Sequence, residues 1–240
     1  MNAIPDHRIV FANLTFKGLT KKVLLREERS LKIIVPVGAE LIVLANTDLR
    51  FREIINNNYA SFDGQIPYLF ARMRNTITRF EKISGSDFIF DVCRYAAENN
   101  KRVFLLGGYQ GSNEQAVSIL RNKYRLSIDG YSPVFKSYPF DEKHNETIVS
   151  RLSVFKPDIL LVAFGAPKQE FWIDDHKKYL DEIGVRWAIC VGGSFEFISG
   201  SERRAPRFIQ SIGFEGLWRL FQNSKRFKRF LAAFKFIKYI

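Results

Sequence analysis

The sequence predicts an α/β fold in which a mostly parallel β-sheet is covered by helices on both faces. Apolar runs of strand length alternate along the chain with amphipathic stretches of about 10 to 15 residues, the pattern of β-α-β units. Several runs are hydrophobic at nearly every position, as in strands buried on both faces. The arrangement is Rossmann-like, and ligands of such sheets bind where strands end and helices begin.

The first hundred residues supply one strand and three helices. The expected elements are a strand over Glu40–Asn46 and helices over Thr47–Asn57, Tyr68–Arg74 and Asp87–Asn99. Asn46 or Thr47 is the expected cap of the first helix. Tyr59–Phe62 is a short apolar segment that leads into the turn Asp63-Gly64.

The alternation is more regular in the second half of the chain. Strands are expected over Arg102–Leu106, Ser127–Gly130, Asp158–Phe164 and Trp187–Val191, with helices over Glu114–Lys123, Asp141–Phe155 and Pro167–Leu180. Glycines follow most of these strands, so the backbone can turn sharply or approach a ligand there.

Composition excludes several classes of protein. The 240 residues are 46% hydrophobic and 26% charged, as in globular proteins and unlike disordered chains. No apolar run approaches the roughly 20 residues that span a bilayer, and no secretion signal is visible. Cys93 and Cys190 are read as two buried thiols in a reducing compartment. A cytoplasmic location is therefore expected.

Positive charge is concentrated at the end of the chain. Lys and Arg total 37 against 25 Asp and Glu, and residues 201–240 hold ten basic and two acidic residues. Such an excess predicts a polyanionic partner: a nucleic acid, an anionic membrane surface or a phosphorylated substrate. We therefore divide the chain into a core over residues 1–200 and a basic C-terminal helical appendage over residues 201–240.

The appendage carries an apolar stripe at helical spacing. Its members are Phe227, Phe230, Leu231, Phe234 and Ile237, with lysines and arginines beside them. A basic amphipathic helix of this kind can lie in an anionic membrane interface. Packing of the same stripe on the core is the alternative that the pattern leaves open.

Glycine-rich turns supply the candidate phosphate sites. Gly107 and Gly108 follow a strand and precede a helix, so their backbone N–H groups can approach a phosphate. The spacing is not GxGxxG, and a tight turn without a ligand explains the motif equally well. Gly192 and Gly193, followed by Arg204, form a second turn of this type.

The segment Phe164–Glu170 joins a strand to a helix. Pro167 suits the first helical turn, and Lys168 and Gln169 place a cation and an amide at the positive end of the helix. Such a pair can hold a pyrophosphate or a sugar hydroxyl. A capped helix with solvated polar residues is the competing interpretation.

Asp63 is the candidate catalytic residue. A carboxylate in an apolar cleft can act as a general base, because burial raises its pKa towards neutrality. An Asp-Gly turn is the commoner role of this dipeptide.

Several catalytic and binding motifs are missing from the sequence. The three histidines are scattered, and HExxH, Asp-x-Asp, GxSxG and GxxxxGK[ST] do not occur. No RNP-like, helix-turn-helix or zinc-finger pattern accompanies the basic residues. We therefore expect no metal site, no cofactor and no nucleic-acid partner.

Taken in order, these motifs resemble the WecG/TagA/CpsF family of bacterial glycosyltransferases. The residues that carry the resemblance are Asn46, Asp63-Gly64, Ser84–Asp87, Leu106–Gly108, Pro157–Leu160, Gly165–Glu170, Gly192–Phe195, Arg204–Pro206 and Gly213–Leu220, with Arg226 and Arg229. The likeness runs from about Leu41 to Phe230. The ordered set is specific because it includes both G-x-P-K-Q-E and R-A-P.

The resemblance implies an inverting, metal-independent transfer from a UDP-sugar to a polyprenyl-diphosphate-linked saccharide at the cytoplasmic face of the membrane. Products of the family include enterobacterial common antigen, teichoic acid linkage units and capsular or exopolysaccharide. The family's base corresponds to Asp63, and its C-terminal arginines close over the diphosphate. The residues expected to bind substrate are Asn46, Lys82, Asp87, Gly107, Gly108, Lys168, Gln169, Gly192, Gly193, Arg204, Arg219, Arg226 and Arg229.

This sequence departs from the family pattern at several positions. Leu44 stands where the family often has a threonine two residues before a strand-end asparagine, and Lys82 stands where an arginine is usual. Glu196 replaces an aspartate. Two other functions stay open, a non-catalytic scaffold that binds a nucleotide sugar and a basic nucleic-acid-binding protein, and so does a homo-oligomeric state.

Overall fold

A computed structural model of the chain describes residues 8–202 and 235–240. The C-terminal residues that the sequence singles out between 203 and 234, namely Arg204, Arg219, Arg226 and Arg229, lie outside these ranges. The expected division at residue 200 therefore stays a prediction.

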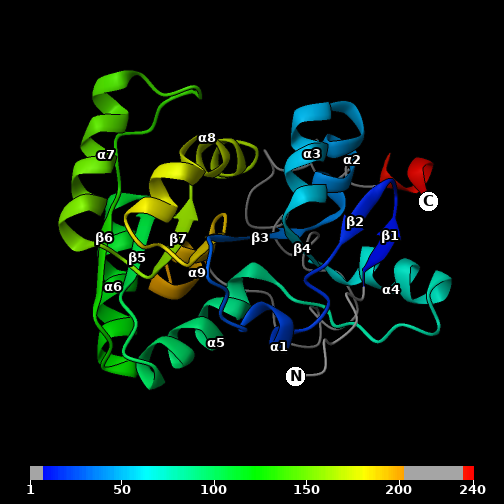
Figure 1. The fold of residues 1–240 in the computed structure, drawn as a ribbon, viewed down its shortest axis with the longest axis horizontal. Helices are drawn as coiled ribbons and strands as arrows, with labels where there is room; N and C mark the ends of the chain where they lie inside the picture. The colour runs from blue at the N-terminus through cyan, green and yellow to red at the C-terminus, as the bar shows by residue number, and fades with distance from the viewer. Residues whose placement is uncertain (1–7, 203–234) are drawn as a thin grey trace. The chain divides into compact units, whose positions relative to one another are not determined.

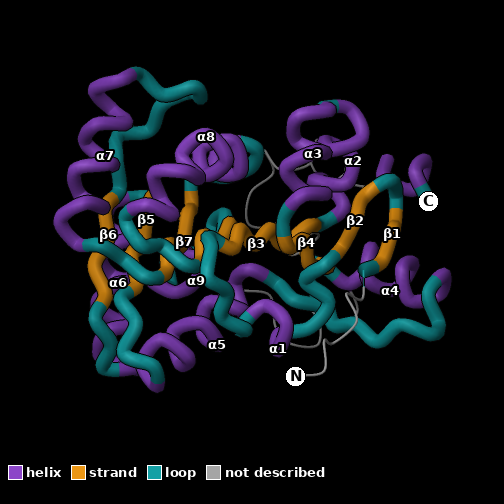
Figure 2. Tube along the Cα trace, viewed as in Figure 1, coloured by secondary structure: helices purple, strands orange, loops and turns teal. Residues whose placement is uncertain are grey.

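The central element is a six-stranded sheet with the strand order β4-β3-β8-β7-β5-β6 (Figures 1 and 2). Its strands are β3(Lys32–Val37), β4(Tyr59–Phe62), β5(Val103–Gly107), β6(Ile128–Tyr131), β7(Ile159–Ala163) and β8(Trp187–Cys190). The pairs β3–β8, β8–β7, β7–β5 and β5–β6 are parallel. The predicted α/β fold with a mostly parallel sheet is thus confirmed.

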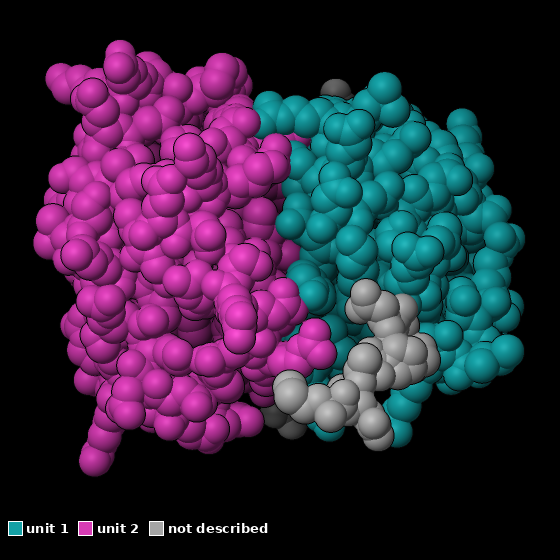
Figure 3. Space-filling view, in the orientation of Figure 1, with its two compact units in different colours: residues 1–24, 35–84, 204–240 teal, residues 25–34, 85–203 magenta. Residues whose placement is uncertain are grey.

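The chain divides into two compact units, which Figure 3 shows in different colours. Unit 1 consists of residues 1–24, 35–84 and 204–240, and unit 2 of residues 25–34 and 85–203. Strand β3 contributes to both, because its first three residues belong to unit 2 and its last three to unit 1.

Unit 2 is a sheet covered by helices on both faces. Its helices are α5(Gly85–Glu98), α6(Gln110–Tyr124), α7(Glu142–Phe155), α8(Lys168–Glu182) and α9(Ser194–Ser199). Figure 1 shows α5, α6 and α9 on one face and α7 and α8 on the other. Every residue of β5, β7 and β8 is buried, which explains why these strands are hydrophobic at nearly every position.

Unit 1 has an aromatic core. It contains the hairpin β1(Ile9–Phe11) and β2(Leu14–Phe16), helices α1(Lys21–Leu24), α2(Ala39–Thr47), α3(Leu49–Asn57) and α4(Gln65–Arg74), strand β4 and the 3₁₀ helix η2(Lys235–Tyr239). Phe16 and Phe62 stack with ring centroids 3.9 Å apart, and Phe80 adds a third ring 4.9 Å from Phe62. Phe236 packs edge-on against Phe70 of α4 at 5.8 Å.

The prediction of a strand over Glu40–Asn46 was wrong. These residues form most of helix α2, and the strand of this region is β3, over Lys32–Val37, which the sequence analysis did not identify. Short apolar runs do not distinguish a buried strand from a buried helix by periodicity alone. In α2 the buried residues are Ile42 and Ala45, three positions apart, which is a helical spacing.

The cap assigned to the next helix was also wrong. Asp48 occupies the N-cap position of α3, and its carboxylate accepts a hydrogen bond of 3.0 Å from the Phe51 N–H. The other strands and helices predicted before residue 200 are present, with bounds that differ by a few residues. The predicted C-terminal helix lies largely outside the described residues. Cys93 and Cys190 are free and buried, as predicted.

Candidate functional site

Unit 2 carries three glycine turns at the ends of neighbouring strands. Gly107 ends β5 and Gly108 follows it, with φ of 96° and 72°. Gly165 lies two residues after β7 with φ of 76°, and Gly192 lies two residues after β8 with φ of 52°. A Cβ on Gly107 would lie 2.9 Å from the backbone of Ala163. Glycine is therefore required at Gly107 both by its left-handed conformation and by the close approach of the adjacent strand.

The helices that follow these turns begin without a capping side chain. The N-cap residues of α6, α8 and α9 make no capping hydrogen bond with their own side chains, whereas Asp48 and Asp141 cap α3 and α7. The first N–H groups of a helix carry a partial positive charge and bind anions when no side chain is bonded to them. Of the three helix starts, that of α8, where Lys168 adds a cation, best fits an anionic ligand.

Glu196 of α9 lies against the first of these turns. Its Oε1 accepts a hydrogen bond of 3.2 Å from the Tyr109 N–H, and it would lie 3.4 Å from a Cβ on Gly108. Oε2 is buried and finds no hydrogen-bond partner among the described residues. A carboxylate in this position accepts hydroxyl donors and repels phosphate, so the Gly107-Gly108 turn suits a hydroxyl-bearing group better than the phosphate that the sequence suggested.

Gln169 links two of the turns. Its Nε2 donates to Glu170 Oε1 at 2.8 Å, and its Oε1 accepts from the Gly192 N–H at 3.2 Å. Only 4% of Gln169 is exposed. The amide that was expected to contact substrate therefore holds the turn after β8 against the start of α8.

Glu170 completes this link and was not singled out by the sequence analysis. It is fully buried, and burial raises the pKa of its carboxyl to about 7. The Cys190 thiol lies beside it, and burial together with the carboxyl raises the pKa of that thiol. The sequence shows Glu170 in the first turn of the predicted helix. An acidic residue there is usually solvated, so no pattern in the sequence indicates that this one is buried.

Lys168 lies at the start of α8 beside an exposed aromatic ring. Its Nζ is 3.7 Å from the centroid of Phe135 and donates to the Lys136 carbonyl at 3.3 Å. Partial burial lowers the pKa of its amine. The cation thus stands where the uncapped helix N-terminus begins, as the sequence predicts.

Asp63 lies in unit 1, directly after β4. Its backbone N–H donates to the Val37 carbonyl at 3.0 Å, so the strand ladder fixes its position. Phe62 forms a parallel bridge with Lys82, and the Ile83 N–H donates to the Phe62 carbonyl at 2.8 Å. Asp63 and Lys82 are far apart in the sequence. These backbone contacts place them on neighbouring segments of unit 1.

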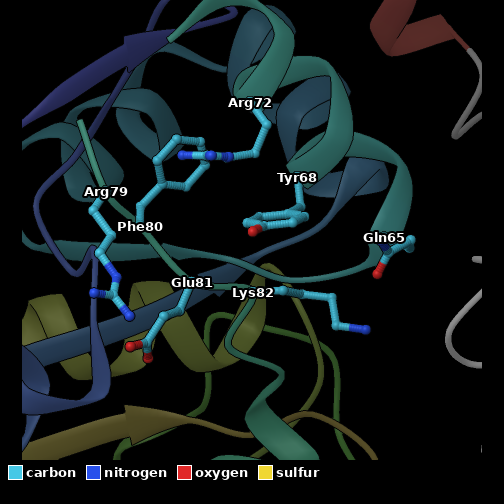
Figure 4. Close-up of a pocket in the computed structure, with 7 residues that line it drawn as sticks. All are labelled: Gln65, Tyr68, Arg72, Arg79, Phe80, Glu81 and Lys82. Carbon is cyan, nitrogen blue, oxygen red and sulfur yellow. The ribbon is translucent and has the colours of Figure 1, made fainter. Parts of the chain in front are cut away.

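A positively charged hollow of about 440 Å³ lies in the same unit (Figure 4). Helix α4 lines it with Gln65, Tyr68 and Arg72, spaced three and four residues apart so that they share a face. The segment after α4 adds Arg79, Phe80, Glu81 and Lys82.

Three cations and one carboxylate line this hollow. The Arg72 guanidinium lies over the Phe80 ring, 5.5 Å from its centroid, and Glu81 accepts a hydrogen bond from the Lys21 N–H. Of the lining residues only Lys82 was predicted. The available signal for Gln65, Tyr68 and Arg72 was their spacing of three and four residues directly after the Asp63-Gly64 turn.

The last two predicted residues in the described part of the chain are Asn46 and Asp87, and neither lines the hollow or a glycine turn. Asn46 was placed at a strand end, but it lies in α2, where its Nδ2 donates to the Ala12 and Ile42 carbonyls and its Oδ1 accepts from Asn13. The strand before it ends at Val37. Asp87 lies exposed in the first turn of α5.

Within residues 8–202 and 235–240, no group of three or more His, Cys, Asp or Glu side chains is arranged to hold a metal ion.

No helix in the described part of the chain is both long enough and apolar enough to cross a membrane.

Comparison with known proteins relates the whole chain to glycosyl transfer. Residues 6–240 match the model of the Glycosyl transferase WecG/TagA/CpsF family. Among similar proteins are the N-acetylglucosaminyldiphosphoundecaprenol N-acetyl-beta-D-mannosaminyltransferases of Staphylococcus aureus strains MW2 and MRSA252. Each is 29% identical over 199 residues, which cover 82% of this chain and 74% of the relative. The chain belongs to the WecG/TagA/CpsF family of glycosyltransferases.

Proposed function

We propose that this glycosyltransferase moves a sugar from a UDP-sugar donor to a polyprenyl-diphosphate-linked saccharide in the synthesis of a cell-surface polysaccharide. The family match over residues 6–240 carries the proposal. The names of the Staphylococcus aureus relatives specify an acceptor of this class, a diphosphoundecaprenol that bears N-acetylglucosamine. Asp63 directly follows Phe62, which forms a bridge with Lys82, and this supports the proposal, because an acid and a cation are groups that metal-free sugar transfer uses.

Asp63 is the proposed general base. It takes the proton from an acceptor hydroxyl while that oxygen attacks the anomeric carbon of the donor. The bond between the anomeric carbon and the UDP oxygen breaks, and its electron pair leaves with the diphosphate. A single displacement of this kind inverts the anomeric centre.

Protein cations are the proposed counter-charge for the two diphosphates. In unit 2, the uncapped start of α8 and Lys168 are suited to the diphosphate of the donor. In unit 1, the cations of the hollow at Lys82 are suited to the diphosphate of the acceptor. No metal ion enters the scheme.

Glu196 has a separate part in donor binding. Its buried carboxylate, held by the Tyr109 N–H, is suited to accept hydrogen bonds from the vicinal hydroxyls of a ribose or a sugar. Gly193 lies next to this carboxylate, since a Cβ on Gly193 would be 3.5 Å from Glu196 Oε2. The Gln169–Glu170 pair then acts by positioning the Gly192-Gly193 turn.

The resemblance to the family gives the C-terminal arginines a role in binding a diphosphate. Arg204, Arg219, Arg226 and Arg229 are proposed to close over a diphosphate, and the basic appendage is proposed to hold the protein at the anionic inner face of the cell membrane. We retain Asp87 as a proposed contact. Asn46 is bonded within its own unit, and its part in binding has no further support.

A transfer assay tests the proposal. Purified full-length protein is incubated with a panel of UDP-sugars, and with an N-acetylglucosaminyl-diphospho-polyprenol in lipid vesicles. We expect one UDP-sugar to yield free UDP and an acceptor that is longer by one sugar, at the same rate in the presence of EDTA.

The alternatives predict different outcomes of the same assay. Binding of UDP without product for any donor would favour a non-catalytic scaffold. Strongly salt-dependent affinity for DNA or RNA, without UDP binding, would favour a nucleic-acid-binding protein.

A further inference from the structure

Helix α4 and the loop after it present exposed apolar side chains among arginines. Leu69, Met73 and Ile77 are exposed to 48%, 77% and 98%. Three of the ten large exposed hydrophobic residues in the described part of the chain thus fall within nine consecutive residues. Burial of apolar surface drives folding, so such a concentration indicates a surface that is covered in the working protein.

The charge of this segment has one sign. Between Asp63 and Glu81 the sequence contains Arg72, Arg74 and Arg79 and no Asp or Glu. Arg74 and Arg79 are exposed. An apolar surface with arginines interspersed along its segment is complementary to an anionic lipid surface, where apolar side chains enter the acyl boundary and cations stay at the headgroups.

We propose that Leu69, Met73 and Ile77, together with Arg72, Arg74 and Arg79, form a membrane-docking surface for an anionic bilayer. We call these six residues the α4 surface. The proposal deepens the membrane association proposed above, which rested on the C-terminal appendage, by adding a second contact in the body of unit 1.

The arrangement of the side chains favours lipid over a protein partner. Ile77 is 98% exposed, so it makes almost no contact with its own unit and protrudes from the loop after α4. Leu69 and Met73 are four residues apart on one face of α4. Separate protruding apolar residues with arginines between them suit a fluid surface, because a protein interface has a continuous, closely packed apolar centre.

The same helix also lines the positively charged hollow. Gln65, Tyr68 and Arg72 face into it, as Figure 4 shows, and Leu69 and Met73 lie on the adjoining face, about one quarter of a turn further round the helix. Docking through the α4 surface would therefore bring the hollow to the lipid headgroups. A lipid-linked diphosphate could then enter the hollow without leaving the bilayer.

A fluorescent reporter tests the surface without any substrate. An environment-sensitive dye is attached to Ile77→Cys in the full-length chain, and the matched control carries it on Val154→Cys, a position that is 85% exposed in unit 2. The native Cys93 and Cys190 are buried and remain unlabelled. With vesicles of phosphatidylglycerol and phosphatidylcholine, we expect a blue shift at position 77, none at position 154, and none at either with phosphatidylcholine alone.

A second pair of variants measures the contribution to affinity. Leu69→Ser/Met73→Ser/Ile77→Ser is compared with Val10→Ser/Leu49→Ser/Val154→Ser, which changes apolar residues that are equally exposed elsewhere. We expect the first triple variant to bind the anionic vesicles about tenfold more weakly and the second to bind as wild type. Circular dichroism checks that both are folded.

Two results would overturn the proposal. The emission of the dye at position 77 could stay unchanged while the protein sediments with the vesicles. The protein would then bind the vesicles through the appendage and not through the α4 surface. The emission could instead shift with protein concentration in the absence of lipid, which would make the α4 surface a contact between copies of the chain. Either result leaves the proposed sugar transfer standing, since no donor or acceptor is present.

Discussion

The two units hold their polar groups in opposite ways. In unit 2, Gln169, Glu170 and Glu196 are exposed to only 4%, 0% and 6%, and each is bonded to a backbone turn or to its neighbour. In unit 1, cations surround an open hollow, and Lys82 and Arg72 are half-buried. Unit 2 is built to hold fixed turns in place, and unit 1 leaves charged side chains accessible.

This difference separates stability from activity. Substitutions in the buried network of unit 2 change the free energy of unfolding, because they leave polar groups unpaired or remove a buried ionisable group. Because we propose that the hollow of unit 1 binds the acceptor, we expect substitutions there to change turnover and to leave stability nearly unchanged. Each prediction below tests one side of that contrast.

The largest effect is expected at Asp63. Asp63→Asn keeps the size of the side chain and removes the base, so we expect kcat to fall by about 10²- to 10⁴-fold. The thermal midpoint should match that of wild type, because the strand ladder holds residue 63 through its backbone N–H. Initial rates at saturating donor and acceptor measure the effect, and an unchanged kcat would remove Asp63 from the mechanism.

The next effect concerns Glu170 and the dependence of stability on pH. Burial raises the pKa of its carboxyl from 4.5 to about 7 in the folded protein. Between these values the unfolded chain has released the proton that the folded protein still holds. Wild-type stability therefore falls as pH rises through this window, by roughly 3 kcal/mol, and this contribution is constant above it.

Glu170→Gln keeps the acceptor for Gln169 and cannot ionise. We expect the variant to match wild type near pH 4.5 and to exceed it by roughly 3 kcal/mol at pH 8, as measured by urea unfolding at both pH values. A constant difference between the two proteins across this range would contradict the raised pKa.

A smaller effect is expected at the glycine turns. Gly107→Ala places a Cβ 2.9 Å from the backbone of Ala163, whereas Gly165→Ala meets no atom within 4 Å. Both glycines have positive φ, so each substitution should lower the free energy of unfolding by about 1 kcal/mol or more. We expect Gly107→Ala to lower it by about 1–3 kcal/mol more than Gly165→Ala does. Equal midpoints in chemical denaturation would show that the contact with β7 is not tight.

The smallest effect is expected at a helix cap outside both sites. Asp48→Ala removes the carboxylate that accepts from the Phe51 N–H, and this should cost about 1 kcal/mol of stability. Turnover should be unchanged. Loss of kcat in this variant would mean that activity in unit 1 depends on the packing of α3, contrary to the separation described above.

The sequence was most informative where a short buried run ended in glycine. Strands β5, β7 and β8 were predicted almost to the residue, because each combines continuous hydrophobicity with a turn signal. The helix α2 was mistaken for a strand because Glu40–Asn46 is apolar over a strand's length, while the true strand, Lys32–Val37, contains Pro36. Asn46 was misplaced for the same reason.

Some residues of the candidate site were recognisable from the sequence, but their contacts were not. Asp63, Lys168 and Gln169 stood out from the sequence, yet neither the bridge between Phe62 and Lys82 nor the bond from Gly192 to Gln169 follows from local pattern, since each joins segments about 20 residues apart. The buried state of Glu170 was hidden as well, because burial depends on packing of α8 against the sheet.

We propose that unit 2 binds the UDP of the donor and that unit 1 supplies the base and binds the acceptor. The affinity for UDP tests this assignment most directly. Calorimetric titration of UDP compares wild type with Asp63→Asn in unit 1 and Lys168→Met in unit 2. We predict a Kd within about twofold of wild type for Asp63→Asn and a Kd about tenfold weaker for Lys168→Met, as expected for loss of one charged contact to a phosphate. Loss of UDP binding in Asp63→Asn, with full affinity in Lys168→Met, would contradict the account.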